Sequence, residues 1–127
     1  MKIEHLGFLV NKPISMGNWW IENLKFQLVR QLGNDDDGVS FISDDYGTVL
    51  EFAKINTEES INFNSLEPLK IHFAIECENP QLESKILIQN GATLIGESLR
   101  NDYLSEKILV RDPFGAVIQF VNRKNKL

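Results

Sequence analysis

The feature that most constrains the fold is a repeat between the two halves of the chain. Residues 47–53, GTVLEFA, match residues 115–121, GAVIQFV, with glycine, valine and phenylalanine at the same positions. The starts of the halves also correspond, because IEHLGF at 3–8 parallels KIHFAI at 70–75. The number of residues from His5 to Glu51 is therefore nearly the same as the number from His72 to Gln119. Two copies are too few for a solenoid, so the repeat indicates a duplicated module with pseudo-twofold symmetry.

The same order of elements, β-α-β-β-β, is predicted in both modules. In module 1, residues 1–55, a helix over 15–24 lies among strands at 2–10, 27–32, 39–42 and 48–55. In module 2, residues 69–123, a helix over 81–90 lies among strands at 70–77, 93–97, 106–111 and 116–122. The polar segment 56–68 links the modules. The sequence thus predicts one α+β domain, 1–127, whose two βαβββ modules form a curved mixed sheet.

One face of the predicted sheet carries polar side chains. Along residues 70–77 apolar and polar side chains alternate, so a helix covers one face and the other stays open. The strand over 116–122 carries a long amide, Gln119, which costs roughly 1–3 kcal/mol if it is buried without a partner. Gly7 and Ala74 are small and leave room beside the histidines. We expect four polar side chains to line the open, concave face: His5, Glu51, His72 and Gln119.

Composition narrows the functional classes. The net charge of −5 at pH 7 gives no support for a nucleic-acid partner. No apolar run is long enough to span a bilayer, and Glu4 and His5 stand where a signal peptide would carry apolar residues. The single cysteine, Cys77, is expected to be a buried, inert thiol. We expect a cytoplasmic protein with neither nucleic-acid nor membrane partners.

Other polar and aromatic residues have simpler interpretations. The aspartates at 35–37 lack EF-hand spacing, so they are expected to form a solvated turn. Trp19 and Trp20 lie on the predicted helix and are expected to pack in the core rather than to line a pocket. Arg111, just before a turn at 112–115, is expected to have a structural role.

With these features together, the chain resembles the vicinal-oxygen-chelate superfamily of glyoxalases, bleomycin-resistance proteins and extradiol dioxygenases. The resemblance lies in the paired modules, the histidine that begins each, the polar residue on each last strand, and the Asp-Pro-x-Gly turn at 112–115. It implies a homodimer and a divalent metal, zinc or nickel first, with iron, cobalt or manganese as alternatives. The implied metal ligands are His5, Glu51, His72 and Gln119. The alternative is that the concave face binds no metal and that the same four side chains are solvated or hydrogen-bonded to each other.

The ligand order is similar to that of bacterial glyoxalase I, which ends in a glutamate where this chain has Gln119. A neutral amide is not a useful proton acceptor, so Gln119 cannot be the general base. With the halves exchanged, the order His, Gln, His, Glu resembles that of the methylmalonyl-CoA epimerase branch. Glu51 would then be both a ligand and the catalytic base.

The resemblance implies a metal-dependent lyase or isomerase of glyoxalase type, similar to lactoylglutathione lyase. Its substrate would be a small molecule with adjacent oxygens. A metal-free binding protein of bleomycin-resistance type is the alternative, and an epimerase or extradiol dioxygenase is third. In relatives the loop equivalent to 98–105 borders the substrate. Arg100 and Tyr103 are therefore candidate substrate-binding residues, with an ordinary surface loop as the competing interpretation.

Overall fold

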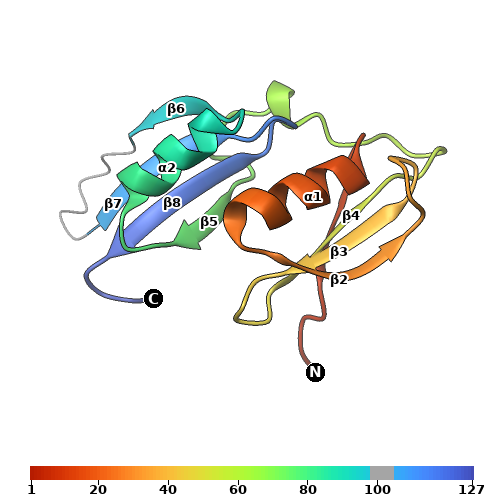
Figure 1. Cartoon of the computed structure of the whole chain (residues 1–127), viewed down its shortest axis with the longest axis horizontal. Coiled ribbons are helices and arrows are strands. Elements are labelled where there is room, and N and C mark those ends of the chain that lie inside the picture. The colour runs from red at the N-terminus through yellow and green to blue at the C-terminus, as the bar shows by residue number, and fades with distance from the viewer. Residues whose placement is uncertain (98–104) are drawn as a thin grey trace. The chain divides into compact units, whose positions relative to one another are not determined.

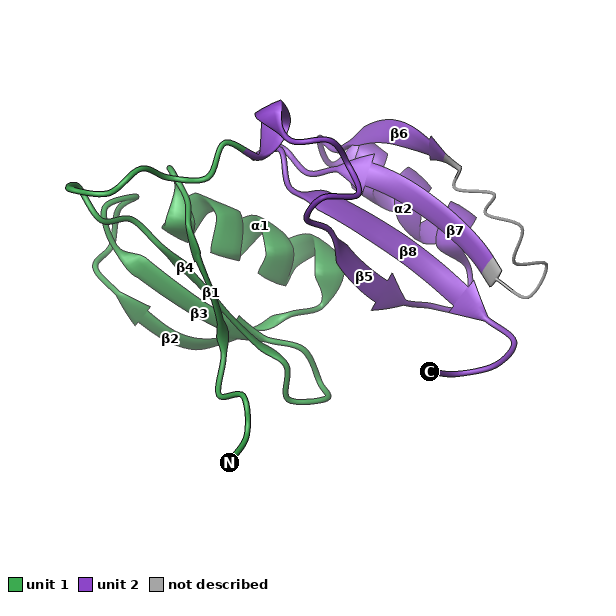
Figure 2. Cartoon of the chain, turned by 180° about the vertical axis from the view of Figure 1, so that it is seen from behind, with its two compact units in different colours: residues 1–62 green, residues 63–127 purple. Residues whose placement is uncertain are grey.

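The computed structural model of the chain describes residues 1–97 and 105–127. The chain divides into two compact units, Met1–Asn62 and Phe63–Leu127 (Figure 2). The boundary lies inside the polar segment 56–68 that was expected to separate the modules. Each unit contains one sheet with one long helix against it (Figure 1).

Unit 1 has the predicted βαβββ order. Its elements are β1 (Leu6–Leu9), α1 (Pro13–Leu24), β2 (Gln27–Leu32), β3 (Val39–Ser43) and β4 (Val49–Ala53). The strands lie in the order β1-β4-β3-β2. The pairing of β1 with β4 is parallel and the other pairings are antiparallel, which makes the sheet mixed.

Unit 2 repeats this topology after a short 3-10 helix, η1 (Phe63–Ser65). Its elements are β5 (Phe73–Glu76), α2 (Pro80–Gln89), β6 (Thr93–Glu97), β7 (Ser105–Arg111) and β8 (Val117–Arg123). The strand order β5-β8-β7-β6, with β5 parallel to β8, is the same as in unit 1. The predicted α+β class and the two βαβββ modules are confirmed, with a mixed sheet in each unit.

The first strand of each unit is shorter than predicted. Residues 2–10 were expected to form a strand, but β1 starts at Leu6, which pairs with Leu50 of β4. The parallel partner explains most of this difference, because in this register residues 2–4 would lie beyond Val49, the first residue of β4. β5 likewise begins one residue after His72, beside the start of β8. Both histidines therefore immediately precede the strands in which they were placed.

The turn before the last strand is built in the same way in both units. Asp44 Oδ1 accepts hydrogen bonds from the backbone N–H groups two and four residues later, at 2.9 and 2.8 Å. Asp112 Oδ1 does the same at 2.8 and 2.9 Å. Gly47 and Gly115 complete these turns with φ of 92° each, a conformation that side chains disfavour. The repeat thus extends from sequence to individual hydrogen bonds.

The N-terminus of α1 has a cap that the sequence analysis missed. Lys12 occupies its N-cap position and provides no side-chain cap, whereas Asn79 caps α2 in the usual way. Asp36, from the loop between β2 and β3, accepts hydrogen bonds from Ser15 N at 2.9 Å and Ser15 Oγ at 2.7 Å. Asp36 lies in a turn, as expected, but it is half-buried and bonded to Ser15, so the expectation that it is solvated was wrong.

The pKa of Asp36 reflects this role. Partial burial acts to raise it, but the hydrogen bonds from Ser15 and the charge of Lys12 outweigh burial, so the pKa lies below 3.8. The carboxylate is therefore charged over the whole neutral range, as an acceptor at a helix N-terminus should be.

The core of unit 1 forms where α1 packs on its sheet. Trp20 is fully buried and contacts the rings of Phe26 and Phe52 edge-on, at centroid distances of 5.4 and 5.6 Å. Trp19 is only half-buried, so the expectation of core packing is confirmed for Trp20 alone. The core of unit 2 lies between α2 and the sheet and includes Leu87, Val110 and Ile118.

Arg111 ties the start of unit 2 to its last turn. Its Nη1 donates to the carbonyl oxygens of Phe63 and Gly115 at 2.9 and 2.8 Å, and its Nη2 donates to that of Leu66 at 2.8 Å. The rigid, forked guanidinium can reach three carbonyls that a single ammonium group could not satisfy together. This contact set supports the structural role expected for Arg111.

Asp36→Ala should destabilise the protein by about 1–2 kcal/mol at pH 7, because it removes the acceptor for the first turn of α1. Asp36 has a lowered pKa in the folded state, so its contribution is present above pH 3.8 and declines as the pH falls through the folded-state value. Urea unfolding at pH 7 and at about pH 3 measures both effects. Asp35→Ala is the matched control, and an equal loss in both variants would contradict the assignment.

Arg111→Lys should lower the free energy of unfolding by about 2 kcal/mol, because at least one backbone carbonyl loses its donor. The measurement is chemical unfolding followed by tryptophan fluorescence. Arg30→Lys, at an exposed position on β2, makes the same chemical change and should have an effect within about 0.5 kcal/mol of zero. Similar effects in the two variants would contradict the role assigned to the guanidinium fork of Arg111.

Candidate functional site

Two of the predicted site residues lie together in unit 1. His5 Nε2 is 3.1 Å from Glu51 Oε2, and the two side chains are 33% and 26% exposed. The other ring nitrogen, Nδ1, is 2.5 Å from Glu4 Oε2. The imidazole therefore lies between two carboxylates and remains accessible from solvent.

The strand register explains how Glu51 reaches His5. Gly7 of β1 pairs with Glu51 of β4, and Phe41 of β3 pairs with Glu51 on the other side. A Cβ atom on Gly7 would lie 2.9 Å from Glu51 Oε2, so the missing side chain provides the space for the carboxylate. The Phe41 ring contacts His5 edge-on at a centroid distance of 5.6 Å. Gly7 was expected to leave room beside the histidine, but the space it leaves is occupied by the Glu51 carboxylate, and a Cβ atom would be 3.9 Å from the His5 ring.

The two carboxylates raise the pKa of His5 above 6.5. The hydrogen bond to Glu4 is the largest cause; desolvation opposes it, and the charges of Glu4 and Glu51 add to it. The charged imidazolium can donate one N–H to each carboxylate. A metal ion that binds Nε2 must therefore displace a proton that Glu51 helps to hold.

Unit 2 carries the equivalent positions with different contacts. Gln119 of β8 is 7% exposed and pairs with Ala74 of β5 and Leu109 of β7, which matches the position of Glu51 between Gly7 and Phe41. His72 is exposed just before β5. Within the described residues, no hydrogen bond between His72 and Gln119 corresponds to the His5–Glu51 contact. The structure therefore preserves the register of the repeat but not its ion pair.

The amide of Gln119 was expected to meet solvent or a partner. Among the described residues, Ser40 Oγ is the one fully buried side-chain polar atom without a hydrogen-bond partner. Neither amide atom of Gln119 is in this class. Ser40 lies under Gly17 of α1, where helix and strand approach closely. The amide of Gln119 is thus not an orphaned polar group in the core.

The geometry of His5 and Glu51 fits two neighbouring ligands of one ion. Donors about 2.1 Å from an ion and at about 90° to each other are about 3.0 Å apart, close to the observed 3.1 Å. Neither within 1–97 nor within 105–127 do three or more His, Cys, Asp or Glu side chains form a group that could hold a metal. The pair therefore offers two donors, and a metal site here would need further ligands. Arg100 and Tyr103, the expected substrate-binding residues, lie outside the described residues.

Cys77 behaves as a weakly reactive thiol. It is half-buried, and desolvation, followed by the charge of Glu83, raises the pKa of its thiol to about 11. Such a thiol is almost fully protonated at neutral pH and is a poor nucleophile or metal ligand. The expectation of an inert thiol is supported, although the side chain is less buried than expected.

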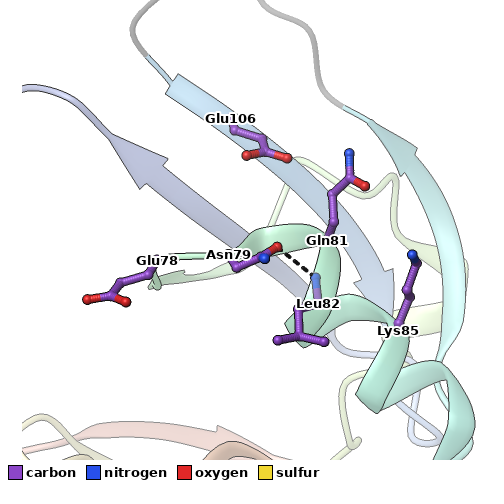
Figure 3. A pocket seen from close by; sticks show the side chains of 6 residues that line it. All are labelled: Glu78, Asn79, Gln81, Leu82, Lys85 and Glu106. Atoms are coloured by element: carbon purple, nitrogen blue, oxygen red, sulfur yellow. Dashed lines mark hydrogen bonds between the residues drawn. The ribbon is translucent and has the colours of Figure 1, made fainter.

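A hollow of about 390 Å³ lies beside the start of α2 (Figure 3). It is lined by Glu78, Asn79, Gln81, Leu82, Lys85 and Glu106. All six residues are exposed, and the carboxylates and the ammonium group give the lining both signs of charge. No predicted site residue lines this hollow, and no sequence signal distinguishes its residues from an ordinary helix surface.

Comparison with solved structures identifies the fold. A glyoxalase-family protein from Bacillus cereus has a TM-score of 0.74 at 12% identity, covering 98% of this chain and 95% of its own. The vicinal-oxygen-chelate fold is the fold of this protein. FosX, a fosfomycin resistance protein from Listeria monocytogenes, has a TM-score of 0.71 at 11% identity, covering 100% and 95%. A glyoxalase/bleomycin resistance protein/dioxygenase from Alicyclobacillus acidocaldarius has a TM-score of 0.67 at 16% identity, covering 98% and 92%.

At identities of 11–16%, these comparisons establish the vicinal-oxygen-chelate fold. No family model matches the sequence, and no curated protein matches it either. Within the described ranges, none of the helices has the length and apolar character needed to cross a membrane.

Gly7→Ala should separate Glu51 from His5, because the new methyl group needs the space of the carboxylate oxygen. The pKa of His5 should then fall towards 6.5, since one of the charges that raises it moves away. NMR titration of the His5 ring protons measures this shift, and His72→Gln assigns the signals. An unchanged His5 titration in Gly7→Ala, with the fold intact, would show that Glu51 does not depend on this space.

Proposed function

We propose that the protein is a divalent-metal-dependent lyase or isomerase of glyoxalase type. Its metal ligands would be His5, Glu51, His72 and Gln119, with zinc or nickel as the first candidates and iron, cobalt or manganese as alternatives. The observation that carries the proposal is the contact of 3.1 Å between His5 Nε2 and Glu51 Oε2 at the positions that the repeat singles out. The vicinal-oxygen-chelate fold supports the same assignment.

Each unit contributes two of the four proposed ligands. His5 and Glu51 offer an imidazole nitrogen and a carboxylate oxygen, which suit a borderline divalent ion. His72 and Gln119 hold the equivalent places in unit 2 and would complete the protein ligands. When bound, the ion would polarise the adjacent oxygens of a small substrate.

Glu51 is the proposed base. Among the four proposed ligands it has the only carboxylate, and the amide of Gln119 cannot take up a proton usefully. Its side chain is 26% exposed, so a substrate proton can reach it. Gly7 leaves the space that this carboxylate occupies beside His5. Arg100 and Tyr103 remain the proposed substrate-binding residues.

A metal-free binding protein of bleomycin-resistance type is the second candidate. It is favoured by the ion pairs of His5, because the two carboxylates already satisfy both ring nitrogens without a metal. An epimerase or an extradiol dioxygenase is a third possibility on the same fold. A homodimer, a small-molecule substrate and a cytoplasmic location are further predictions from the resemblance.

Metal analysis of protein purified without an affinity tag tests the first proposal. We expect one divalent ion per chain, lost in His5→Ala and in His72→Ala but retained in Glu59→Gln, an exposed control. Full occupancy by an organic ligand without a metal would favour the binding protein. Loss of the ion in His5→Ala but not in His72→Ala would exclude His72 as an essential ligand.

Turnover tests the role of Glu51. With the hemithioacetal of glutathione as the first substrate, Glu51→Gln should lower kcat by about 10²–10⁴-fold, because the amide cannot accept a proton. The metal content of each preparation is measured in parallel, since Gln is also a weaker ligand. A Glu51→Gln enzyme that keeps both its metal and its activity would disprove the role of Glu51 as base.

A further inference from the structure

The two histidines of the repeat differ in what precedes them. Glu4 stands before His5, and its Oε2 lies 2.5 Å from Nδ1 of the ring. Ile71 stands before His72, and its side chain has no atom that can accept a hydrogen bond. The repeat therefore aligns a carboxylate in unit 1 with an apolar side chain in unit 2.

The shortened strand β1 makes the contact between Glu4 and His5 possible. Side chains of adjacent residues in a strand point to opposite faces, so two neighbours within a strand would not meet. β1 begins at Leu6, and both Glu4 and His5 precede it. No strand pairing fixes His5, and its ring is held through side-chain contacts with Glu4, Glu51 and Phe41.

The contacts of the His5 ring also determine which of its nitrogens could bind a metal. A histidine ligand binds a metal through one unprotonated nitrogen, while the other N–H commonly donates to a carboxylate that fixes the ring and its tautomer. Here Nδ1 faces Glu4 and Nε2 faces Glu51. A proton kept on Nδ1 by Glu4 leaves the lone pair of Nε2 directed to the side of Glu51.

We propose that Glu4 is a positioning residue, which holds His5 in the Nδ1–H tautomer with Nε2 turned towards Glu51. This inference deepens the proposed function, on which it rests, and it makes the two halves of the site unequal. His5 is oriented before any ligand arrives, whereas His72 has no such neighbour. The half-site of unit 1 should therefore bind first and bind more tightly.

Metal titration with a competing chelator tests the proposal, with Ni²⁺ and Zn²⁺ as probes. Glu4→Ala should weaken binding by about 10–100-fold, the usual effect of losing a carboxylate that orients a ligand histidine. Glu4→Gln keeps an acceptor oxygen and should restore part of the affinity. Glu59→Gln should bind like the wild type. Glu4 is 82% exposed and lies outside β1, so these variants should fold normally.

The ring nitrogens of metal-free protein provide a readout that does not need metal. At a pH where His5 is neutral, ¹⁵N NMR should show the Nδ1–H tautomer in the wild type and a shift towards Nε2–H in Glu4→Ala. If the wild type binds no metal but this tautomer shift occurs, the proposed function fails and the role of Glu4 stands. If metal binds equally well to the wild type and to Glu4→Ala, with the same tautomer, the role of Glu4 is disproved and the proposed function survives.

Discussion

Parallel pairing between the first and last strands of each unit decides which side chains can share a face. In unit 1 this pairing sets Gly7 beside Glu51, and in unit 2 it sets Ala74 beside Gln119. A slip of one residue would turn every side chain of a strand to the opposite face. Because a parallel pair cannot be closed by a short hairpin, the crossover through the helix and the two middle strands has to deliver this register.

The aspartate turns supply a local means of setting that register. Asp44 and Asp112 each fix two backbone N–H groups just before β4 and β8. The last strand therefore starts at a defined residue, and its polar side chain, Glu51 or Gln119, takes a defined place. The same constraint makes the first strand start late, since in this register residues 2–4 have no partner in β4. His5 lies just before the strand, where its ring contacts both carboxylates.

Much of this architecture could be predicted from sequence because the repeat carries it. The strands over 27–32 and 93–97 agree residue for residue with β2 and β6, since turn residues mark their ends. Such local patterns depend on residues close together in the chain, and the sequence displays them directly.

What could not be predicted depends on distant partners. The cap on α1 joins Ser15 to Asp36, 21 residues away, and no local pattern distinguishes Asp36 from its two neighbouring aspartates. The contact between Glu4 and His5 was hidden by the assumption of a longer strand, in which the two side chains would diverge. The length of β1 is set by β4, which lies more than forty residues later in the sequence.

The two halves of the repeat carry different residues at equivalent positions of the candidate site. Unit 1 places two carboxylates around one imidazole, whereas the equivalent positions in unit 2 hold Ile71 and Gln119. Under the proposed function, a cation would therefore be attracted first to the His5 side, and a substrate group that gives up a proton would find its acceptor in Glu51 among the proposed ligands. A duplicated scaffold makes two equivalent places for ligands, but chemistry that moves a proton in one direction needs them to differ. The exchange of Glu for Gln between the last strands supplies that difference without disturbing the register that positions both.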